Sequence, residues 1–334
     1  MATLKLMNPP AATRADGWHG IAAPGGYEAW HFHAEDLTQR IRIVFSFHHG
    51  LALHPDYLRR FDAYRRRPTC NRPPLPSQYP CLHWAIYENK NKGENKNKEP
   101  LASSTTQFPP GAFQADGTSL TLGPNRLIFS RDDIIAHLSR IKESFSAELV
   151  FQPILQAGSV QSILADHYWL PSRPLCQVLG EIRLGARTIA FQGLGRQNQY
   201  YGTAPLAYAA ARWMRGGVLF PRAAVAFQTA DDHATVILAD EAGTRRIENS
   251  PFIVNSTRRT LRLPPHPSAI DFGNWLILRN GRVADSSPAQ LQLLFDAYVD
   301  GEQSTAWVEI AYPKRLSGFL ARRRAERFIA EGST

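Results

Sequence analysis

Apolar and polar side chains alternate along much of this chain of 334 residues. The alternation is clearest at 28–34, where Trp30 and Phe32 lie two positions apart among histidines and small residues. A period of two is typical of a β-strand with one buried face. A second run at 41–47 follows a short polar turn, so the pattern predicts a hairpin at this point.

Similar runs recur through the rest of the chain. Further strands are expected at 82–87, 119–123, 125–130, 147–153, 177–184, 187–191, 218–229, 234–239, 275–278 and 290–299. Turn residues separate the runs at fairly regular intervals, and the sequence has neither βαβ alternation nor a glycine-rich phosphate loop. The predicted class is therefore all-β, a sandwich or barrel. Helices are expected only at 55–66, 204–213 and 316–331.

The predicted strands form two halves of comparable length, with an irregular break near 154–176. We therefore divide the chain into a flexible arm at 1–17, a first β domain at 18–165, a second β domain at 166–316 and a C-terminal helix and tail at 317–334. The low-complexity tract at 89–98 is rich in Asn and Lys and cannot bury apolar surface, so we expect a mobile hairpin tip there.

The formal net charge is +9, which raises the question of a nucleic-acid partner. The arginines are scattered in small groups without a helix-turn-helix, zinc or RNP pattern, so no nucleic-acid partner is expected. A solvated surface is the simplest interpretation, and a peripheral contact with an anionic membrane is the alternative. The three cysteines have no metal-ligand spacing, and neither a secretory signal nor a membrane span is recognisable. These features predict a cytoplasmic protein without disulfides.

Histidines cluster early in the chain, at His31, His33, His48, His49 and His54. The first two share one face of a strand and could bind a metal ion if a third ligand reached them. The favoured interpretation is a pair of polar residues on the outer face, opposite Trp30 and Phe32. No Gly-x-Ser-x-Gly elbow or other nucleophile signature occurs, and no metal ion or cofactor is expected.

The segment 191–202 is the most informative. Its glycines permit a sharp turn or bulge, and they bracket the run Gln197, Asn198, Gln199, Tyr200 and Tyr201. Such a density of polar groups is costly to bury unless the groups are paired. The run is therefore either a hydrogen-bonded network that ties two sheets together or the polar end of a ligand cavity.

Several motifs, in order along the chain, resemble those of the carotenoid 1,2-hydratase family, also called hydroxyneurosporene synthase-like proteins. They lie at 26–34, 167–171, 193–202, 213–216, 249–252 and 312–316, and the resemblance extends from about residue 18 to 316. Lipocalin-like Diels–Alderases and plant tocopherol cyclase are more distantly similar. The resemblance implies two lipocalin-like β-barrel halves with a cavity for an apolar small molecule where they meet. It also implies cofactor-independent addition of water to an acyclic carotenoid.

In this resemblance the acid–base positions of the family fall on Gln197, Asn198 and Gln199, and amides cannot protonate an alkene. The candidate catalytic residues are therefore Asp231, Asp232, Glu28 and Tyr201. The adjacent aspartates are also typical of a polar turn. The candidate substrate-binding residues are Trp30, Gln197, Asn198, Gln199, Tyr200, Trp213 and Phe227, which supply aromatic walls and hydrogen bonds.

Three functions follow from these observations. The first is a hydratase or cyclase that protonates an isoprenoid alkene. The second is a natural-product cyclase of the Diels–Alderase type, for which cavity shape and amide hydrogen bonds to a carbonyl would suffice. The third is a non-catalytic carrier of an apolar ligand.

Overall fold

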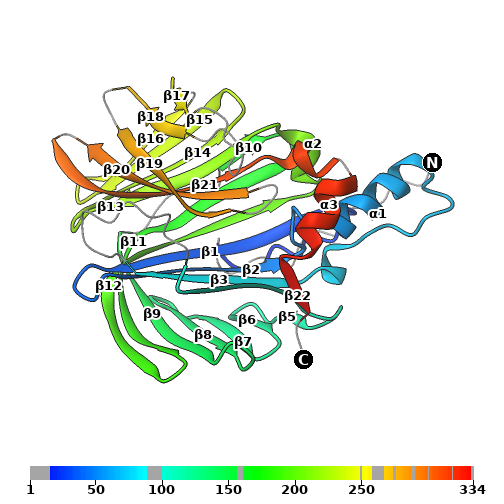
Figure 1. Ribbon diagram of the computed structural model, residues 1–334, viewed down its shortest axis with the longest axis horizontal. Coiled ribbons are helices and arrows are strands. Elements are labelled where there is room, and N and C mark those ends of the chain that lie inside the picture. The colour runs from blue at the N-terminus through cyan, green and yellow to red at the C-terminus, as the bar shows by residue number, and fades with distance from the viewer. Residues whose placement is uncertain are drawn as a thin grey trace.

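The computed structural model describes residues 16–88, 100–155, 161–248, 250–257, 267–273, 276–286, 290–299, 301–317 and 319–331. Strands dominate it, and they form two largely antiparallel sheets of 13 and nine strands. Figure 1 shows the two sheets one above the other, with helices gathered at one end. The predicted all-β class with two halves is confirmed. Residues 1–15 of the arm expected at 1–17 and the tract at 89–98 lie outside the described residues.

The first sheet combines the N-terminal strands with the long central hairpin β11–β12. Its order is β22 (Ile329–Glu331), β4 (Ala102–Gln107), β3 (Cys81–Glu88), β2 (Ile41–His49), β1 (Tyr27–Asp36), β12 (Arg187–Gly202), β11 (His167–Leu184), β9 (Phe145–Leu155), β8 (Ile134–Arg140), β7 (Asn125–Phe129), β6 (Ser119–Leu122) and β5 (Phe113–Ala115). β10 (Gln161–Leu164) pairs with β11 beside this path.

The second sheet is built from the later strands. Its order is β16 (Gly243–Glu248), β15 (His233–Asp240), β14 (Ala223–Ala230), β13 (Trp213–Leu219), β21 (Glu302–Ala311), β20 (Gln290–Val299), β19 (Ile277–Ser286), β18 (Pro267–Asp271) and β17 (Ile253–Ser256). The expected domain boundary after residue 165 lies just before β11. Because β11 and β12 pair within the first sheet, the strands of the second sheet begin at Trp213.

Each sheet has its own apolar core. In the first, Trp30 and Phe32 of β1 are fully buried, and Phe32 stacks on Phe45 with ring centroids 4.6 Å apart. Since side chains alternate across a strand, the opposite face of β1 carries His31 and His33. That face is covered by the second sheet, where His33 stacks on Trp307. The space between the sheets is consequently lined by polar groups.

Three short helices close one end of this space: α1 (Pro55–Arg66), α2 (Leu206–Ala209) and α3 (Phe319–Glu326), with 3₁₀ turns at Pro76–Gln78 and Pro313–Ser317. Helix α1 matches its prediction, whereas the region expected at 204–213 contains only the single turn α2. After α3 the chain ends in β22, which pairs parallel with β4. The expected C-terminal helix is therefore shorter and continues as an edge strand.

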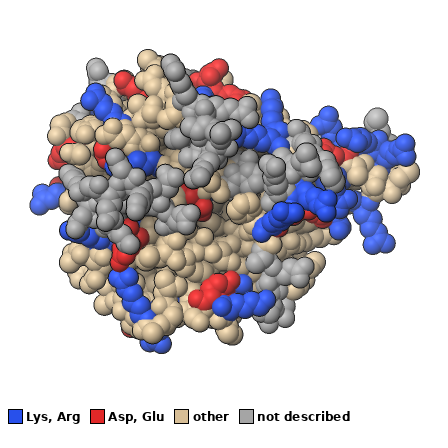
Figure 2. Space-filling model, viewed as in Figure 1, with Lys and Arg blue, Asp and Glu red and all other residues tan. Residues whose placement is uncertain are grey.

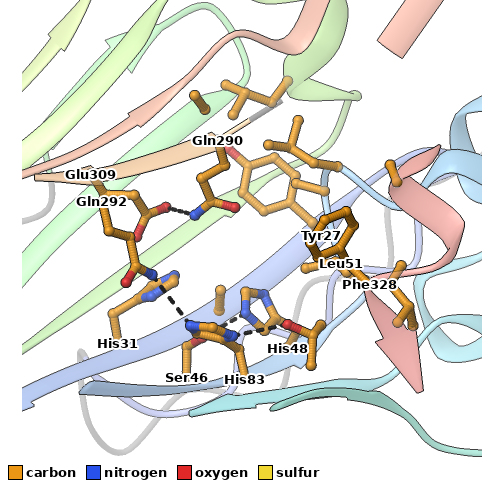
Figure 3. A pocket seen from close by; sticks show the side chains of 18 of the residues that line it. Tyr27, His31, Ser46, His48, Leu51, His83, Gln290, Gln292, Glu309 and Phe328 are labelled. Atoms are coloured by element: carbon orange, nitrogen blue, oxygen red, sulfur yellow. Dashed lines mark hydrogen bonds between the residues drawn. The ribbon is translucent and has the colours of Figure 1, made fainter. Parts of the chain in front are cut away.

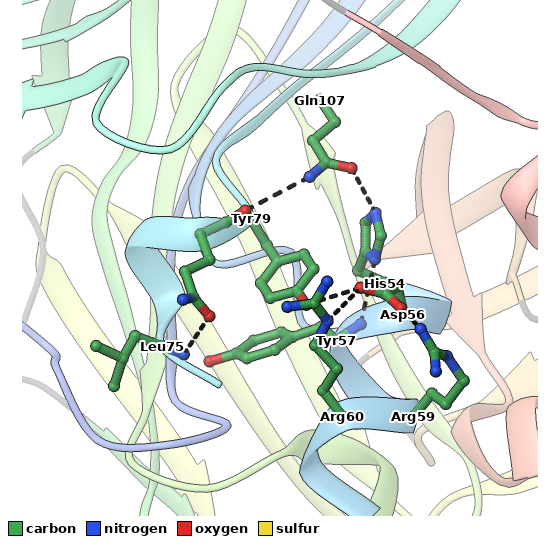
Figure 4. Close-up of polar contacts among 9 residues, drawn as sticks. His54, Asp56, Tyr57, Arg59, Arg60, Leu75, Tyr79 and Gln107 are labelled. Carbon is green, nitrogen blue, oxygen red and sulfur yellow. Dashed lines mark hydrogen bonds and ion pairs between the residues drawn. The ribbon is translucent and has the colours of Figure 1, made fainter. Parts of the chain in front are cut away.

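Polar contacts fix α1 against the first sheet (Figure 4). The His54 side chain caps the helix by accepting from the Tyr57 amide at 3.3 Å, while its Nε2 lies 2.8 Å from Gln107 Oε1 on β4. The Tyr79 hydroxyl donates to Asp56 at 2.9 Å. None of the helices in the part of the chain that the structure describes is long and apolar enough to cross a membrane.

Candidate active site

A cavity of about 340 Å³ lies between the two sheets. Two rows of polar side chains face each other between the sheets, and all their members except Asn198 and Gln228 line this cavity (Figure 3). The first-sheet row consists of cross-strand neighbours Asn198, His31, Ser46, His83 and Thr105. The second-sheet row consists of Gln228, Arg215, Glu309, Gln292 and Asp285, again in register across the strands. Each row thus takes one inward-facing polar residue from each of five neighbouring strands.

Arg215 joins the two rows. Its Nη1 donates to His31 Nε2 at 2.7 Å, and its Nη2 donates to both oxygens of Glu309 at 2.6 and 2.8 Å. Gln290 also donates to Glu309. The guanidinium lies 4.7 Å from the ring centroid of Tyr200, a favourable cation–π distance. Glu309 therefore accepts two charge-assisted hydrogen bonds from one guanidinium.

A second contact across the rows runs through Gln292. The Tyr87 hydroxyl donates to Gln292 Oε1 at 2.5 Å, which turns the amide nitrogen toward His83 Nε2 at 3.3 Å. Because that ring nitrogen accepts, the other must carry the proton, and it lies 2.9 Å from Thr105 Oγ1. His83 is thus fixed as one neutral tautomer.

Burial dominates the electrostatics of the cavity. It lowers the pKa values of His31 and His48 well below that of a free histidine, and the Arg215 charge lowers both further. Burial also raises the pKa of Tyr200 to about 12, although Arg215 opposes this shift. The imidazoles and the phenol are consequently neutral near pH 7, beside one ion pair.

The helical end of the cavity is mostly apolar. It is lined by Leu51, Ala52, Leu53, Leu206, Leu316, Phe328 and Ile329. Phe328 is 56% exposed, so it lies at the rim. Figure 2 shows basic side chains gathered on this end of the molecule, where α1 carries exposed arginines such as Arg65 and Arg66. The cavity therefore has an apolar mouth and a polar end.

Two carboxylates line the cavity, and their surroundings differ. Glu309 receives hydrogen bonds from Arg215 and Gln290, as described above. Asp285 is half-buried, and its Oδ1 accepts from the Ser286 amide at 2.7 Å. Its Oδ2 has no hydrogen bond among the described residues. Asp285 is the cavity carboxyl that is available to a ligand.

The pleat of β12 separates the polar run at 197–201. Asn198 and Tyr200 pair with His31 and Ala29 of β1, so they lie on the face toward the second sheet. Gln197, Gln199 and Tyr201 project from the opposite face. One face of the run is thus turned toward the space between the sheets. The hydrogen bonds of the other face lie on the side of the first sheet turned away from the second, so they do not tie the two sheets together.

Glu28 belongs to that internal network. Its Oε1 accepts from the backbone amide of His19 and from Gln199 Nε2, and it lies 2.8 Å from His19 Nδ1. Burial raises its pKa. Tyr201 stacks on His19 nearby with ring centroids 4.1 Å apart, and Trp30 lies in the first core. None of these side chains lines the inter-sheet cavity, whereas their neighbour Tyr200 does.

The two aspartates lie at a turn between β14 and β15. Asp231 has a positive φ of 51°, and its carboxylate accepts from the amides of Ala211 and Arg212. Asp232 is exposed. Phe227 lies in the second core, whereas Trp213 lines the cavity.

Sequence reasoning missed most of the polar rows. The unrecognised residues that line the cavity include Arg215, Glu309, Gln292, Asp285 and His83. A charged residue within an otherwise apolar strand, such as Arg215 after Trp213 and Met214, was the available signal. Among the described residues, no group of three His, Cys, Asp or Glu side chains could hold a metal ion.

No family model matches this chain. Comparison with individual proteins does find relatives. Over 291 residues it is 24% identical to a protein of Chlorobaculum tepidum named hydroxyneurosporene dehydrogenase, a match that covers 78% of this chain and 73% of that protein. The crystal structure of an AttH protein from Nitrosomonas europaea is similar with a TM-score of 0.65 and 15% identity, over 93% of this chain and 100% of the other. Kievitone hydratase from Nectria haematococca is similar with a TM-score of 0.51 and 10% identity, over 86% and 89% of the two chains. The chain is a distant homologue of the first protein and shares the lipocalin-like fold of the two solved structures.

Proposed function

From this distant homology to a carotenoid enzyme, we propose that the chain is a hydratase whose active site is the cavity between the two sheets. The proposed substrate is an acyclic carotenoid or another isoprenoid with a terminal trisubstituted double bond. The observation that carries the proposal is the division of the cavity into an apolar mouth and a polar end. A long hydrocarbon can lie in the mouth while its terminal double bond reaches the polar rows.

We assign Asp285 as the proton donor. Glu309 is unsuited to this role because Arg215 stabilises its anion. Transfer of the Asp285 proton to the less substituted alkene carbon forms a C–H bond and leaves a tertiary carbocation. The aromatic rings that line the cavity supply negative potential close to that cation.

Water then attacks the cation, and the resulting oxonium must lose a proton. We assign this step to His48, whose Nε2 lies 2.8 Å from Ser46 Oγ. In the tautomer that donates Nε2–H to Ser46, Nδ1 has a free lone pair. A protonated alcohol is so acidic that an imidazole with a lowered pKa can still accept its proton. Return of that proton to Asp285 completes a net addition of one water.

The test is to express the protein in cells that make lycopene or neurosporene and to measure the pigments by mass spectrometry. A product heavier by one water supports the proposal. A product lighter by two hydrogens would indicate dehydrogenation and would overturn it. Unchanged pigment, with expression of the protein confirmed, would also overturn the carotenoid proposal, and pigment that then co-purified intact would favour the carrier.

A further inference from the structure

A smaller cavity of about 50 Å³ continues behind the two polar rows. It shares His31, Arg215 and Glu309 with the main cavity. Its own lining includes Arg196, His33, Asn198 and Trp307. A space of this size can hold several non-hydrogen atoms but not a hydrocarbon chain.

Arg196 is a buried cation without a counter-ion. It is 5% exposed and makes no hydrogen bond or ion pair with any residue that the structure describes. The neighbouring arginines differ, because Arg42 donates to Glu35 at 2.7 Å and Arg215 to Glu309 at 2.6 Å. Arg42 and Arg215 thus each have a carboxylate partner, whereas Arg196 has none among the residues that the structure describes. Buried charges in proteins are normally paired.

The electrostatics agree with this arrangement. The pKa of Arg196 is lowered to about 10, mainly by burial and also by the charges of Arg215 and Arg42, while Tyr200 opposes the shift. Both ring nitrogens of His33 are also buried without a hydrogen-bond partner. The Asn198 carbonyl accepts from Trp169 at 3.4 Å, which leaves its amide hydrogens free to donate.

The second sheet leaves room for this guanidinium. A β-carbon on Gly217 of β13 would lie 1.7 Å from Arg196 Nη1 and 2.3 Å from the Val225 carbonyl oxygen. Glycine within a strand often marks a place where another group approaches closely. The first sheet thus supplies Arg196, and the second sheet leaves space for its guanidinium at Gly217.

We propose that this small cavity is an anion site that binds a monovalent anion, of the size of chloride or of a carboxylate group, on Arg196. Asn198 and a His33 N–H complete the donor set. The anion is either an inorganic ion held in the structure or the acidic end of an amphiphilic ligand that extends from the main cavity. The site does not depend on the proposed hydration, because anion binding can be measured without turnover.

The first experiment uses bromide as the probe. Crystals of the full chain grown in sodium bromide should show an anomalous peak within hydrogen-bond distance of the Arg196 guanidinium. In solution at constant ionic strength, bromide should raise the melting temperature in a saturable manner compared with gluconate. Arg196→Met should abolish the saturable part, and Arg222→Met, at an arginine whose side chain is 83% exposed, should leave it unchanged.

The second experiment distinguishes the source of the anion. Calorimetric titration compares hexadecanoate with hexadecanol, which differ only in the head group. A ligand carboxylate would be identified by two results. Bromide and hexadecanoate would compete, and hexadecanoate would bind about tenfold more tightly than hexadecanol, a preference that Arg196→Met would remove. Binding of bromide without competition would identify an inorganic ion. The absence of a bromide peak in wild-type crystals, together with no Arg196-dependent preference for the acid, would overturn the proposal.

Discussion

At the scale of single residues, the direction in which a side chain leaves its strand decides its role. Tyr200 lines the main cavity and Asn198 the smaller one, while Gln197 and Gln199 project from the opposite face of β12. Arg215 is the central residue of the polar rows because it contacts His31 and Glu309 together. Loss of Glu309 would leave the largely buried charge of Arg215 uncompensated.

We therefore expect Glu309→Gln to lower the free energy of unfolding by about 2–3 kcal/mol, since Arg215 would lose a charged, doubly bonded partner. Urea denaturation measures this change. The control is Glu241→Gln, because the Glu241–Arg222 pair is exposed and 3.8 Å long and should contribute little. Equal effects of the two substitutions would contradict the importance assigned to the inter-sheet ion pair.

At the scale of elements, the sequence predicted the strands better than their partners. The alternation at 28–34 and 41–47 identified β1 and β2, and the strands expected at 177–184 and 187–191 are parts of β11 and β12. Which strands pair depends on contacts distant in sequence, which local patterning does not contain. For the same reason the two polar rows could not be predicted, because each row takes one residue from each of five strands.

The helices at the cavity mouth also show how far local sequence patterns predict structure. The expected C-terminal helix became α3 and β22, because backbone pairing with the free edge of β4 competes with helix formation. Arg322 of α3 forms an ion pair with Asp62 of α1 at 2.6 Å, and Tyr208 of α2 donates to the same carboxylate. Asp62 thus connects all three helices at the cavity mouth.

We expect Asp62→Ala to speed amide hydrogen exchange in α3 while exchange in β12 stays unchanged. The global free energy of unfolding should fall by only about 0.5–1 kcal/mol, because the ion pair is partly solvated. Exchange monitored by mass spectrometry gives the local readout. Asp240→Ala, which removes an exposed pair with Arg245, is the control and should leave α3 unaffected. Unaltered exchange in α3 of the Asp62 variant would show that other contacts fix this end.

At the scale of the whole molecule, two apolar cores are joined through a polar interface that contains several buried histidines. Burial lowers the pKa values of His31, His33 and His48 in this interface. It also lowers the pKa of His49, which lies on the opposite face of β2 beside Trp18 and Phe113, from 6.5 to about 4. At a pH between the pKa of such a histidine in the folded chain and its pKa in the unfolded chain, only the unfolded chain binds the proton. Stability should consequently be complete above about pH 7 and should fall as the solution is acidified.

For His49, the window in which stability is lost runs from pH 6.5 down to about 4. His49→Gln should reduce the slope of unfolding free energy against pH by up to about 1.4 kcal/mol per pH unit in this window. Urea denaturation at a series of pH values measures the slope. His233→Gln, at an exposed position, should leave the slope unchanged. An unaltered slope in the His49 variant would contradict the shift.

The central claim is that chemistry takes place between the two sheets, and one comparison tests it most directly. Asp285→Asn and Asp231→Asn are matched substitutions, one in the cavity and one at the turn between β14 and β15. The measurement is the yield of hydrated carotenoid in pigment-producing cells at equal protein levels. We expect Asp285→Asn to lower the yield by about 100-fold or more and Asp231→Asn to retain it. Retained yield with Asp285→Asn and lost yield with Asp231→Asn would place the acid outside the cavity and contradict the claim.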